Sequence, residues 1–243
     1  MRRYKHFKLL IVILITGLVN LSYAQSLDDI VAKHIIAMGG ADKLSKFKSV
    51  KISANMEVMN MEMPVTTTIV QDKGFRTETT AQGMTIVQAV NGNTGWMINP
   101  MAGQSKATAL PEEVVKTMTS QTDLTGLYNY KEKGYTLAME GEEDIAGAKV
   151  YKVVVTLKNG IKQENYISKD TFYILKIVAM VPVNGQDIKT ESLQSDFKQV
   201  DGITFPFSSE VTTTAMPGMA MVNKIASIEI NPKIDDSIFA MPN

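Results

Sequence analysis

Apolar and polar residues alternate over much of the chain, which is the period of a β-strand with one buried face. Between residues 49 and 58, Ile52, Ala54, Met56 and Val58 alternate with lysine, serine, asparagine and glutamate. Similar rows recur further along, and the pattern predicts about ten strands, at residues 49–58, 65–70, 75–80, 84–90, 94–98, 135–139, 151–157, 175–181, 203–211 and 220–230, with a weaker one at 104–109. We therefore expect a chain built mainly from antiparallel hairpins.

Short turn signals separate these segments. Asn91-Gly92 is typical of a type I′ hairpin turn, in which both central residues need a positive φ. The same signal recurs in three later loops, at Asn159-Gly160, Asn184-Gly185 and Asp201-Gly202. The apolar positions also change parity within the methionine-rich stretch 56–63, so we expect a turn or bulge near Asn60.

Two regions have a helical pattern instead. Ser26 can cap a helix that carries an apolar stripe and ends at Gly39-Gly40, and a short helical turn follows at 41–47. Residues 111–128 begin with a proline and two glutamates, which favour a helix start, and predict one or two helices inserted between strands. The apolar stripe of this insertion is narrow, so we interpret it as a movable lid; the alternative is a static helix that closes the sheet. The residues assigned to the lid are Pro111, Val114, Met118 and Leu124.

These elements predict a mainly β protein with α-helices, organised as a single large antiparallel sheet. A sheet of about ten strands must curl, and the N-terminal helix and the inserted helices can then cover its concave side. No linker rich in proline, glycine or serine divides residues 25–243, so we expect one domain there.

The first 24 residues resemble a secretory signal peptide rather than part of the fold. A basic start precedes an apolar run, Leu9 to Leu21, that is short for a membrane span, and Ser22-Tyr23-Ala24 predicts cleavage before Gln25. We therefore expect a soluble, exported protein. The remaining chain has 21 basic and 25 acidic residues, a net charge of −4, and no Lys/Arg cluster, which argues against nucleic acid as a partner.

The sequence has few residues suited to catalysis. It has no cysteine, and it lacks the motifs of zinc proteases, serine hydrolases, phosphate loops and dinucleotide sites. His34, the one histidine after the leader, is expected at a helix surface or edge. We therefore predict a protein that is not an enzyme and that has no metal and no cofactor.

Methionine is unusually frequent, with 15 residues after the leader and two clusters, at 59–63 and 216–221. Three interpretations remain open. Methionine fills irregular gaps in cores, it makes adaptable apolar binding surfaces, and its thioether can bind Cu(I) in an exported protein.

Several short motifs together resemble the LolA/LolB-like superfamily of outer-membrane lipoprotein-sorting proteins. They are Asn91-Gly92-x-x-Gly95-Trp96-x-Ile98-x-Pro100, Gly134-Tyr135, Val200-Asp201-Gly202-Ile203-x-Phe205-Pro206, Lys33-His34-x-x-Ala37-x-Gly39-Gly40 and Asn231-Pro232-x-Ile234-Asp235-Asp236-x-x-Phe239. The resemblance implies an unclosed β-barrel, helices over its mouth, a hydrophobic cavity for acyl chains, and the periplasm of a Gram-negative cell. LolA itself has an Arg-Pro pair on an early strand that helps to hold its lid; this chain has none, and Arg76 is its one arginine after the leader.

We therefore expect a periplasmic carrier or binding protein, monomeric, that shelters the acyl chains of a lipoprotein or lipid. Exposing a chain of about sixteen carbons to water costs on the order of 10 kcal/mol, and an apolar cavity removes that cost. An inner-membrane transporter and an outer-membrane acceptor would be its partners. Two alternatives are a periplasmic sensor or scaffold module that binds a protein partner, and a methionine-based Cu(I)-binding protein. The residues expected to line the cavity are Met56, Val58, Met61, Met63, Trp96, Ile98, Val115, Met118, Val153, Val155, Leu175, Ile177, Phe205 and Phe207.

Overall fold

Residues 26–183 and 186–242, which the computed structural model describes, form one antiparallel sheet of thirteen strands. The predicted signal peptide and the Asn184-Gly185 turn lie outside the described residues. The strands are β1 (Ser49–Val58), β2 (Met61–Val70), β3 (Gly74–Ala81), β4 (Met84–Asn91), β5 (Thr94–Asn99), β6 (Gln104–Ala109), β7 (Thr136–Ile145), β8 (Ala148–Thr156), β9 (Lys162–Ser168), β10 (Ile174–Val183), β11 (Gln186–Val200), β12 (Ile203–Thr213) and β13 (Ala220–Ile230).

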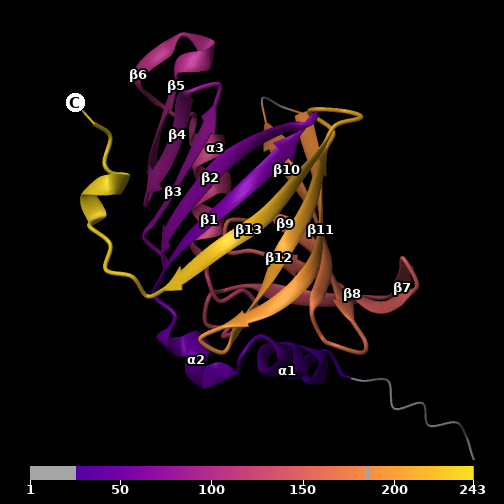
Figure 1. The fold of residues 1–243 in the computed structure, drawn as a ribbon. Helices are drawn as coiled ribbons and strands as arrows, with labels where there is room; N and C mark the ends of the chain where they lie inside the picture. The colour runs from indigo at the N-terminus through magenta and orange to yellow at the C-terminus, as the bar shows by residue number, and fades with distance from the viewer. Residues whose placement is uncertain (1–25, 184–185, 243) are drawn as a thin grey trace, which may run out of the picture.

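The sheet is curled but not closed (Figure 1). Its strand order is β6-β5-β4-β3-β2-β1-β13-β12-β11-β10-β9-β8-β7, so β6 and β7 are its two edges among the described strands. The first and last strands, β1 and β13, pair in the middle. This confirms the expected mainly β fold with a single curled antiparallel sheet.

Two strands, β9 and β11, were not expected from the apolar pattern. Their sequences are rich in glutamine, asparagine, serine and charged residues, so neither shows a row of apolar residues. Their pairing with β8, β10 and β12 places them in the sheet nevertheless. Part of the sheet therefore presents polar side chains where an apolar row would ordinarily lie.

The hairpin turns follow the glycine and asparagine signals, with one shift. Met59 and Asn60 (φ 51° and 63°) and Asp201 and Gly202 (φ 49° and 77°) form two-residue loops with positive φ at both positions, as type I′ turns require. In the β4–β5 hairpin, however, Asn91 pairs with Thr94, so the loop is one residue later than predicted and Gly92 takes its first position.

Helices α1 (Leu27–Ala37) and α2 (Ala41–Lys46) lie across one end of the curled sheet (Figure 1). Ser26 caps α1 by accepting a hydrogen bond from the Asp29 backbone N–H at 3.1 Å. The expected surface position of His34 is wrong: its side chain is 5% exposed, and its Nδ1 donates to the carbonyl oxygen of Phe172 at 2.8 Å. The loop between β9 and β10 covers this edge of the helix, which its local sequence does not reveal.

The inserted helix α3 (Glu112–Thr119) lies within the curl of the sheet, and the 3₁₀ turn η2 (Ser120–Thr122) continues it (Figure 1). Helical structure therefore ends at Thr122, before the predicted limit of residue 128. Helix α3 contacts β3, β4, β5 and β10, so it bridges two distant parts of the sheet. Gly95 allows its close approach, since a Cβ there would lie 2.9 Å from Val115 Cγ2.

The C-terminal segment packs against the opposite face of β3 and β4. Its 3₁₀ helix η3 (Asp236–Phe239) buries Phe239, which is 1% exposed. The ring lies over Gly74, where a Cβ would come within 2.6 Å of it. A further 3₁₀ turn, η1 (Pro100–Ala102), joins β5 to β6. Among the described residues, no helix has both the length and the apolar character needed to cross a membrane.

Candidate functional site

The concave side of the sheet, which we call the inner face, is the side that packs against α3. Two buried apolar clusters lie on it. One joins α2 and α3 to the sheet and comprises Leu44, Phe47, Val50, Ile69, Phe75, Val90, Val115, Met118 and Ile203. The other lies under α1 and comprises Ile30, Val31, Leu127, Tyr151, Val153, Val155 and Ile167. These clusters fix the helices at one end of the curl.

The far ends of β1, β2 and β13 carry an apolar surface that is not packed into either cluster. Val50 and Ile52 belong to the inner face, and alternation along β1 brings Met56 and Val58 to the same side. Cross-strand pairing adds Met63 opposite Met56, and both Met61 and Met221 opposite Val58. Met61 is 49% exposed and the others are half-buried. We call Met56, Val58, Met61, Met63 and Met221 the methionine surface.

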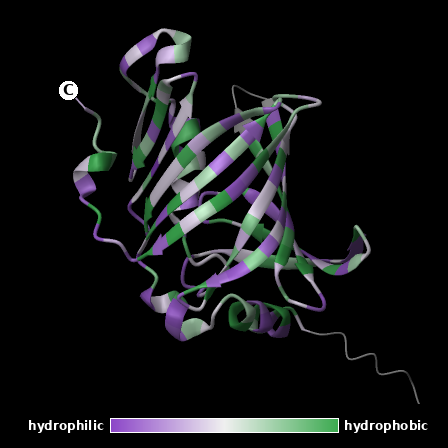
Figure 2. Cartoon of the chain, viewed as in Figure 1, coloured by the Kyte–Doolittle hydropathy of each residue, from purple (hydrophilic) through white to green (hydrophobic). Residues whose placement is uncertain are grey.

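Figure 2 shows the sequence pattern behind this surface: hydrophilic and hydrophobic residues alternate along the strands of the curled sheet. Alternation directs successive side chains to opposite faces. The change of parity seen in the sequence at 56–63 is produced by the Met59-Asn60 turn, which keeps the methionines of both strands on one face.

A pocket of about 230 Å³ lies between the helices and the sheet. Its lining includes Ile35, Met38, Leu124, Ile177, Gln194 and Phe205, which come from α1 and its C-cap, the segment after η2, and strands β10 to β12. Phe205 also contacts Phe47 edge to face, with ring centres 5.8 Å apart. The pocket is mostly apolar, and it is smaller than the 300–1,000 Å³ typical of small-molecule sites.

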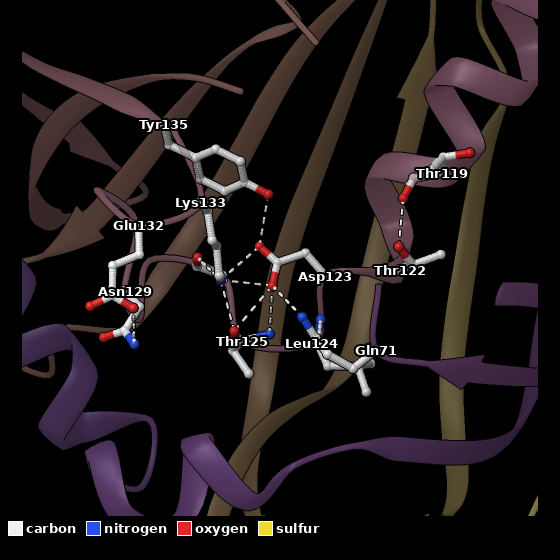
Figure 3. A network of polar contacts seen from close by, with 11 residues as sticks. Gln71, Thr119, Thr122, Asp123, Leu124, Thr125, Asn129, Glu132, Lys133 and Tyr135 are labelled. Carbon is white, nitrogen blue, oxygen red and sulfur yellow. Dashed lines mark hydrogen bonds and ion pairs between the residues drawn. The ribbon is translucent and has the colours of Figure 1, made fainter. Parts of the chain in front are cut away.

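A polar network holds the segment that follows η2 (Figure 3). Lys133 Nζ lies 2.7 and 2.9 Å from the two carboxylate oxygens of Asp123, and it also donates to Thr125 Oγ1 and to the carbonyl oxygen of Gly126. Tyr135 donates its hydroxyl proton to Asp123 Oδ2 at 3.0 Å. We call Asp123, Lys133 and Tyr135, with their partners, the Asp123 network.

The network is mostly shielded from water, and this changes its acid–base behaviour. The side chains of Lys133 and Asp123 are 18% and 11% exposed. Burial lowers the pKa of Lys133 despite its carboxylate partner, and burial together with the Asp123 charge raises the pKa of Tyr135. Gln71 links the network to the β2–β3 turn, because its Oε1 accepts from the Leu124 backbone N–H at 2.7 Å. The sequence contains no motif for this network; residues 123 and 133 lie ten positions apart in a segment without regular structure.

Ten of the residues predicted for the cavity lie on the inner face or on α3. They are Met56, Val58, Met61, Met63, Val115, Met118, Val153, Val155, Ile177 and Phe205. Val153 and Val155 are fully buried under α1, so they are part of the core, whereas Met56, Met61 and Met63 on β1 and β2 are accessible. Phe207 is half-buried on β12, with Lys198 Nζ 4.8 Å from its ring centre.

Three predicted cavity residues lie on the opposite face. Trp96 and Ile98 pack with Val87 and Ala89 in a separate cluster, and Trp96 Nε1 donates to the carbonyl oxygen of Phe239 at 2.9 Å. This corrects the expectation that Trp96 lies at the cavity. The outer face of the sheet is apolar at Trp96 because the C-terminal segment covers it there. That segment lies about 140 residues away in sequence.

Leu175 is the third predicted cavity residue that lies on the opposite face, and a β-bulge explains its position. The pairing of β10 with β9 shifts between Ile174 and Lys176, so the alternation changes there. Leu175 consequently packs with Val150, Tyr166 and Val178, away from the inner face.

Three of the four predicted lid residues, Val114, Met118 and Leu124, pack against the inner face, whereas Pro111 is exposed. Pro111 is the N-cap of α3, Met118 is buried, and Val114 and Leu124 are half-buried against the first cluster. Helix α3 therefore fills part of the curl.

Comparisons with known proteins agree with this architecture. A LolA superfamily protein from Nitrosomonas europaea has a similar structure, with a TM-score of 0.59 and 14% identity over 89% of this chain and 98% of that one. A DUF1329 family protein from Desulfovibrio piger has a TM-score of 0.57 and 15% identity, over 87% of this chain and 97% of that one. A putative outer membrane lipoprotein-sorting protein domain from Vibrio parahaemolyticus has a TM-score of 0.54 and 15% identity, over 87% of this chain and 94% of that one.

Comparisons of the sequence identify fewer similar proteins than the comparison of structures. A search of curated proteins found no match. A family model, whose description reads "-like: Uncharacterized protein", matches residues 74–243. The chain therefore belongs to the family that this model describes, and its fold is that of LolA superfamily proteins.

Proposed function

We propose that this protein is a carrier that binds the acyl chains of a lipid or lipidated protein on its inner face. The observation that carries the proposal is the methionine surface, an accessible apolar area inside an open curled sheet. Methionine side chains are unbranched and polarizable, so they adapt to flexible chains. Each methylene group removed from water there contributes about 0.8 kcal/mol.

Helix α3 would act as the lid. The pocket beside it, about 230 Å³, is small for a ligand with long acyl chains, so binding requires α3 and the segment after it to move outwards. The helix has eight residues, and isolated helices shorter than about 12 residues are marginal in water. It packs on the sheet through Val115 and Met118, and release of these contacts would give a second, open position.

The cellular setting follows from the same proposal. One structural neighbour is described as a putative outer membrane lipoprotein-sorting protein domain, which supports a lipidated cargo and an exported, periplasmic protein. The signal peptide predicted at residues 1–24 is consistent with that location. A membrane transporter that loads the cargo and an outer-membrane acceptor would be its partners, and the protein itself would not be an enzyme.

The test is ligand binding by the mature protein. Mass spectrometry of organic extracts from gently purified protein should identify a co-purified amphiphile, and a fluorescent C16 acyl probe should bind and be displaced by palmitate. Met63→Asp should weaken probe binding at least tenfold, because it places a charge among the methionines. Met101→Asp, at a methionine in η1 that is 46% exposed and lies outside the methionine surface, is the control and should bind normally.

A further variant separates apolar binding from metal binding. Met56→Leu/Met63→Leu keeps the apolar area but removes two thioethers, so it should retain probe binding within about twofold. Wild-type protein that binds Cu(I) but no acyl probe, with Cu(I) binding lost in the double variant, would contradict the proposal in favour of a metal site.

A further inference from the structure

Asn165 is a buried polar residue on the inner face whose hydrogen bonding is incomplete. Its side chain is 5% exposed, and its amide oxygen Oδ1 has no hydrogen-bond partner among the described residues. Pairing places it between Val153 on β8 and Ile177 on β10. Buried polar atoms in native proteins almost always have partners, because leaving one without a partner is costly.

The surroundings of Asn165 are also unusual for an apolar carrier. Ile177 lines the pocket, and its partner on the other side is Ser192 of β11. Gln194, two residues along β11, lines the same pocket. Asn165 itself does not line the pocket, but neighbouring strands are about 4.8 Å apart, so its backbone lies one strand away from Ile177 of the pocket lining. The two strands that lack an apolar row in the sequence, β9 and β11, thus bring hydrogen-bonding groups to the inner face.

We infer that the cargo carries an O–H or N–H group that donates a hydrogen bond to Oδ1 of Asn165. This rests on the proposed function and specifies its ligand: an amphiphile with an alcohol or amide donor next to its acyl chain, in preference to a plain ester or a carboxylate. A carboxylate or an ester can only accept hydrogen bonds, so neither could satisfy the Asn165 oxygen. Asn165 would then select among lipids, while the methionine surface supplies affinity for any acyl chain.

The experiment compares two ligands of equal chain length, hexadecanamide and methyl hexadecanoate, as competitors of a fluorescent acyl probe. Wild-type protein should prefer the amide about three- to tenfold. Asn165→Leu, which keeps a similar volume without the oxygen, should bind both within twofold of each other. Gln163→Leu changes an amide on the same strand and the same face, and should keep the wild-type preference. Repeating the comparison with hexadecanol distinguishes an alcohol donor from an amide donor.

The ligand-free variant provides a second measurement that does not depend on the choice of ligand. Replacing a polar atom that lacks a partner with an apolar group is neutral or stabilising, so Asn165→Leu should melt at or above the wild-type temperature. A clearly lower melting temperature, or an amide preference retained in Asn165→Leu, would overturn the inference. If acyl ligands bind without any amide preference, the inference fails while the proposed function stands; if no acyl ligand binds, both fail.

Discussion

Phe239 and Trp96 form the main contact between the C-terminal segment and the outside of the sheet. Besides the hydrogen bond from Trp96, Arg76 donates to the carbonyl oxygen of Ile238 at 2.8 Å, and Lys73 pairs with Asp236. The Arg76 guanidinium also lies 5.4 Å from the centre of the Trp96 ring. Both residues singled out in the sequence, the one tryptophan and the one arginine after the leader, therefore serve to attach the chain end.

Phe239→Ala should destabilise the protein by about 3 kcal/mol, because it empties a fully buried site over Gly74. Trp96 should become more exposed, with a red-shifted emission. Urea unfolding followed by tryptophan fluorescence measures both effects. Met241→Ala, at a side chain that is 48% exposed nearby, should change stability by less than about 0.5 kcal/mol. An unchanged emission in Phe239→Ala would show that the segment does not shield Trp96.

His34 should make stability fall in mild acid. Burial lowers the pKa of its imidazole in the folded state, so below about pH 6.5 the unfolded chain binds a proton that the folded chain does not. The folded protein is therefore most stable above that pH, and between pH 6.5 and 5 it should lose at most about 1.4 kcal/mol per pH unit.

The check is urea denaturation at pH 7.5, 6 and 5 for wild type and His34→Gln. The variant lacks the group that titrates in this range, so its stability should change less between these values. Equal slopes for the two proteins would show that His34 is not held neutral.

Among the elements, the segment from η2 to β7 depends most on a single interaction. The Asp123 network fixes the backbone of this segment, because Gln71 accepts from the Leu124 N–H, Asp123 accepts from the Thr125 N–H, and Lys133 donates to the carbonyl oxygen of Gly126. The network serves mainly to position this segment. A buried ion pair stabilises a fold little more than apolar residues packed in its place would, but removing one of its two charges is strongly destabilising.

Lys133→Met should destabilise the protein by about 3 kcal/mol, because Asp123 would remain buried without its cation. Hydrogen exchange should accelerate in α3 and in residues 120–135 more than in the sheet. Lys131→Met removes an exposed ion pair with Asp28 and should leave both measurements unchanged. Combining Lys133→Met with Asp123→Leu should recover part of the loss, and no recovery would mean that the cost does not come from an unpaired charge.

The sequence predicted those elements whose inner face is apolar. Val50 to Val58 and Phe205 are examples, and the turn near Asn60 followed from the change of parity. It did not predict β9 and β11, where polar residues such as Asn165 and Gln194 point inwards, or the position of Trp96, which is covered by residues far away in sequence. Local patterns report which faces are apolar, whereas the partner that covers each face depends on tertiary contacts.

For the molecule as a whole, the open sheet leaves two edges that could pair with other chains. Edge strand β7 carries Glu140, Glu142 and Glu143 and a bulge beside Gly141, and edge strand β6 has only six residues. Charges, bulges and short strands are features that discourage edge pairing. The acidic stretch is thus explained by its position at an edge.

The central claim, that α3 must leave the inner face for cargo to bind, can be tested by fixing α3 in place. Gly95 and Val115 are close enough for a disulfide, and the chain has no other cysteine to compete. In oxidised Gly95→Cys/Val115→Cys, uptake of the fluorescent acyl probe should be at least tenfold slower than in wild type, and reduction should restore it. Equal uptake by the oxidised and reduced forms, with the disulfide verified by mass spectrometry, would contradict the account.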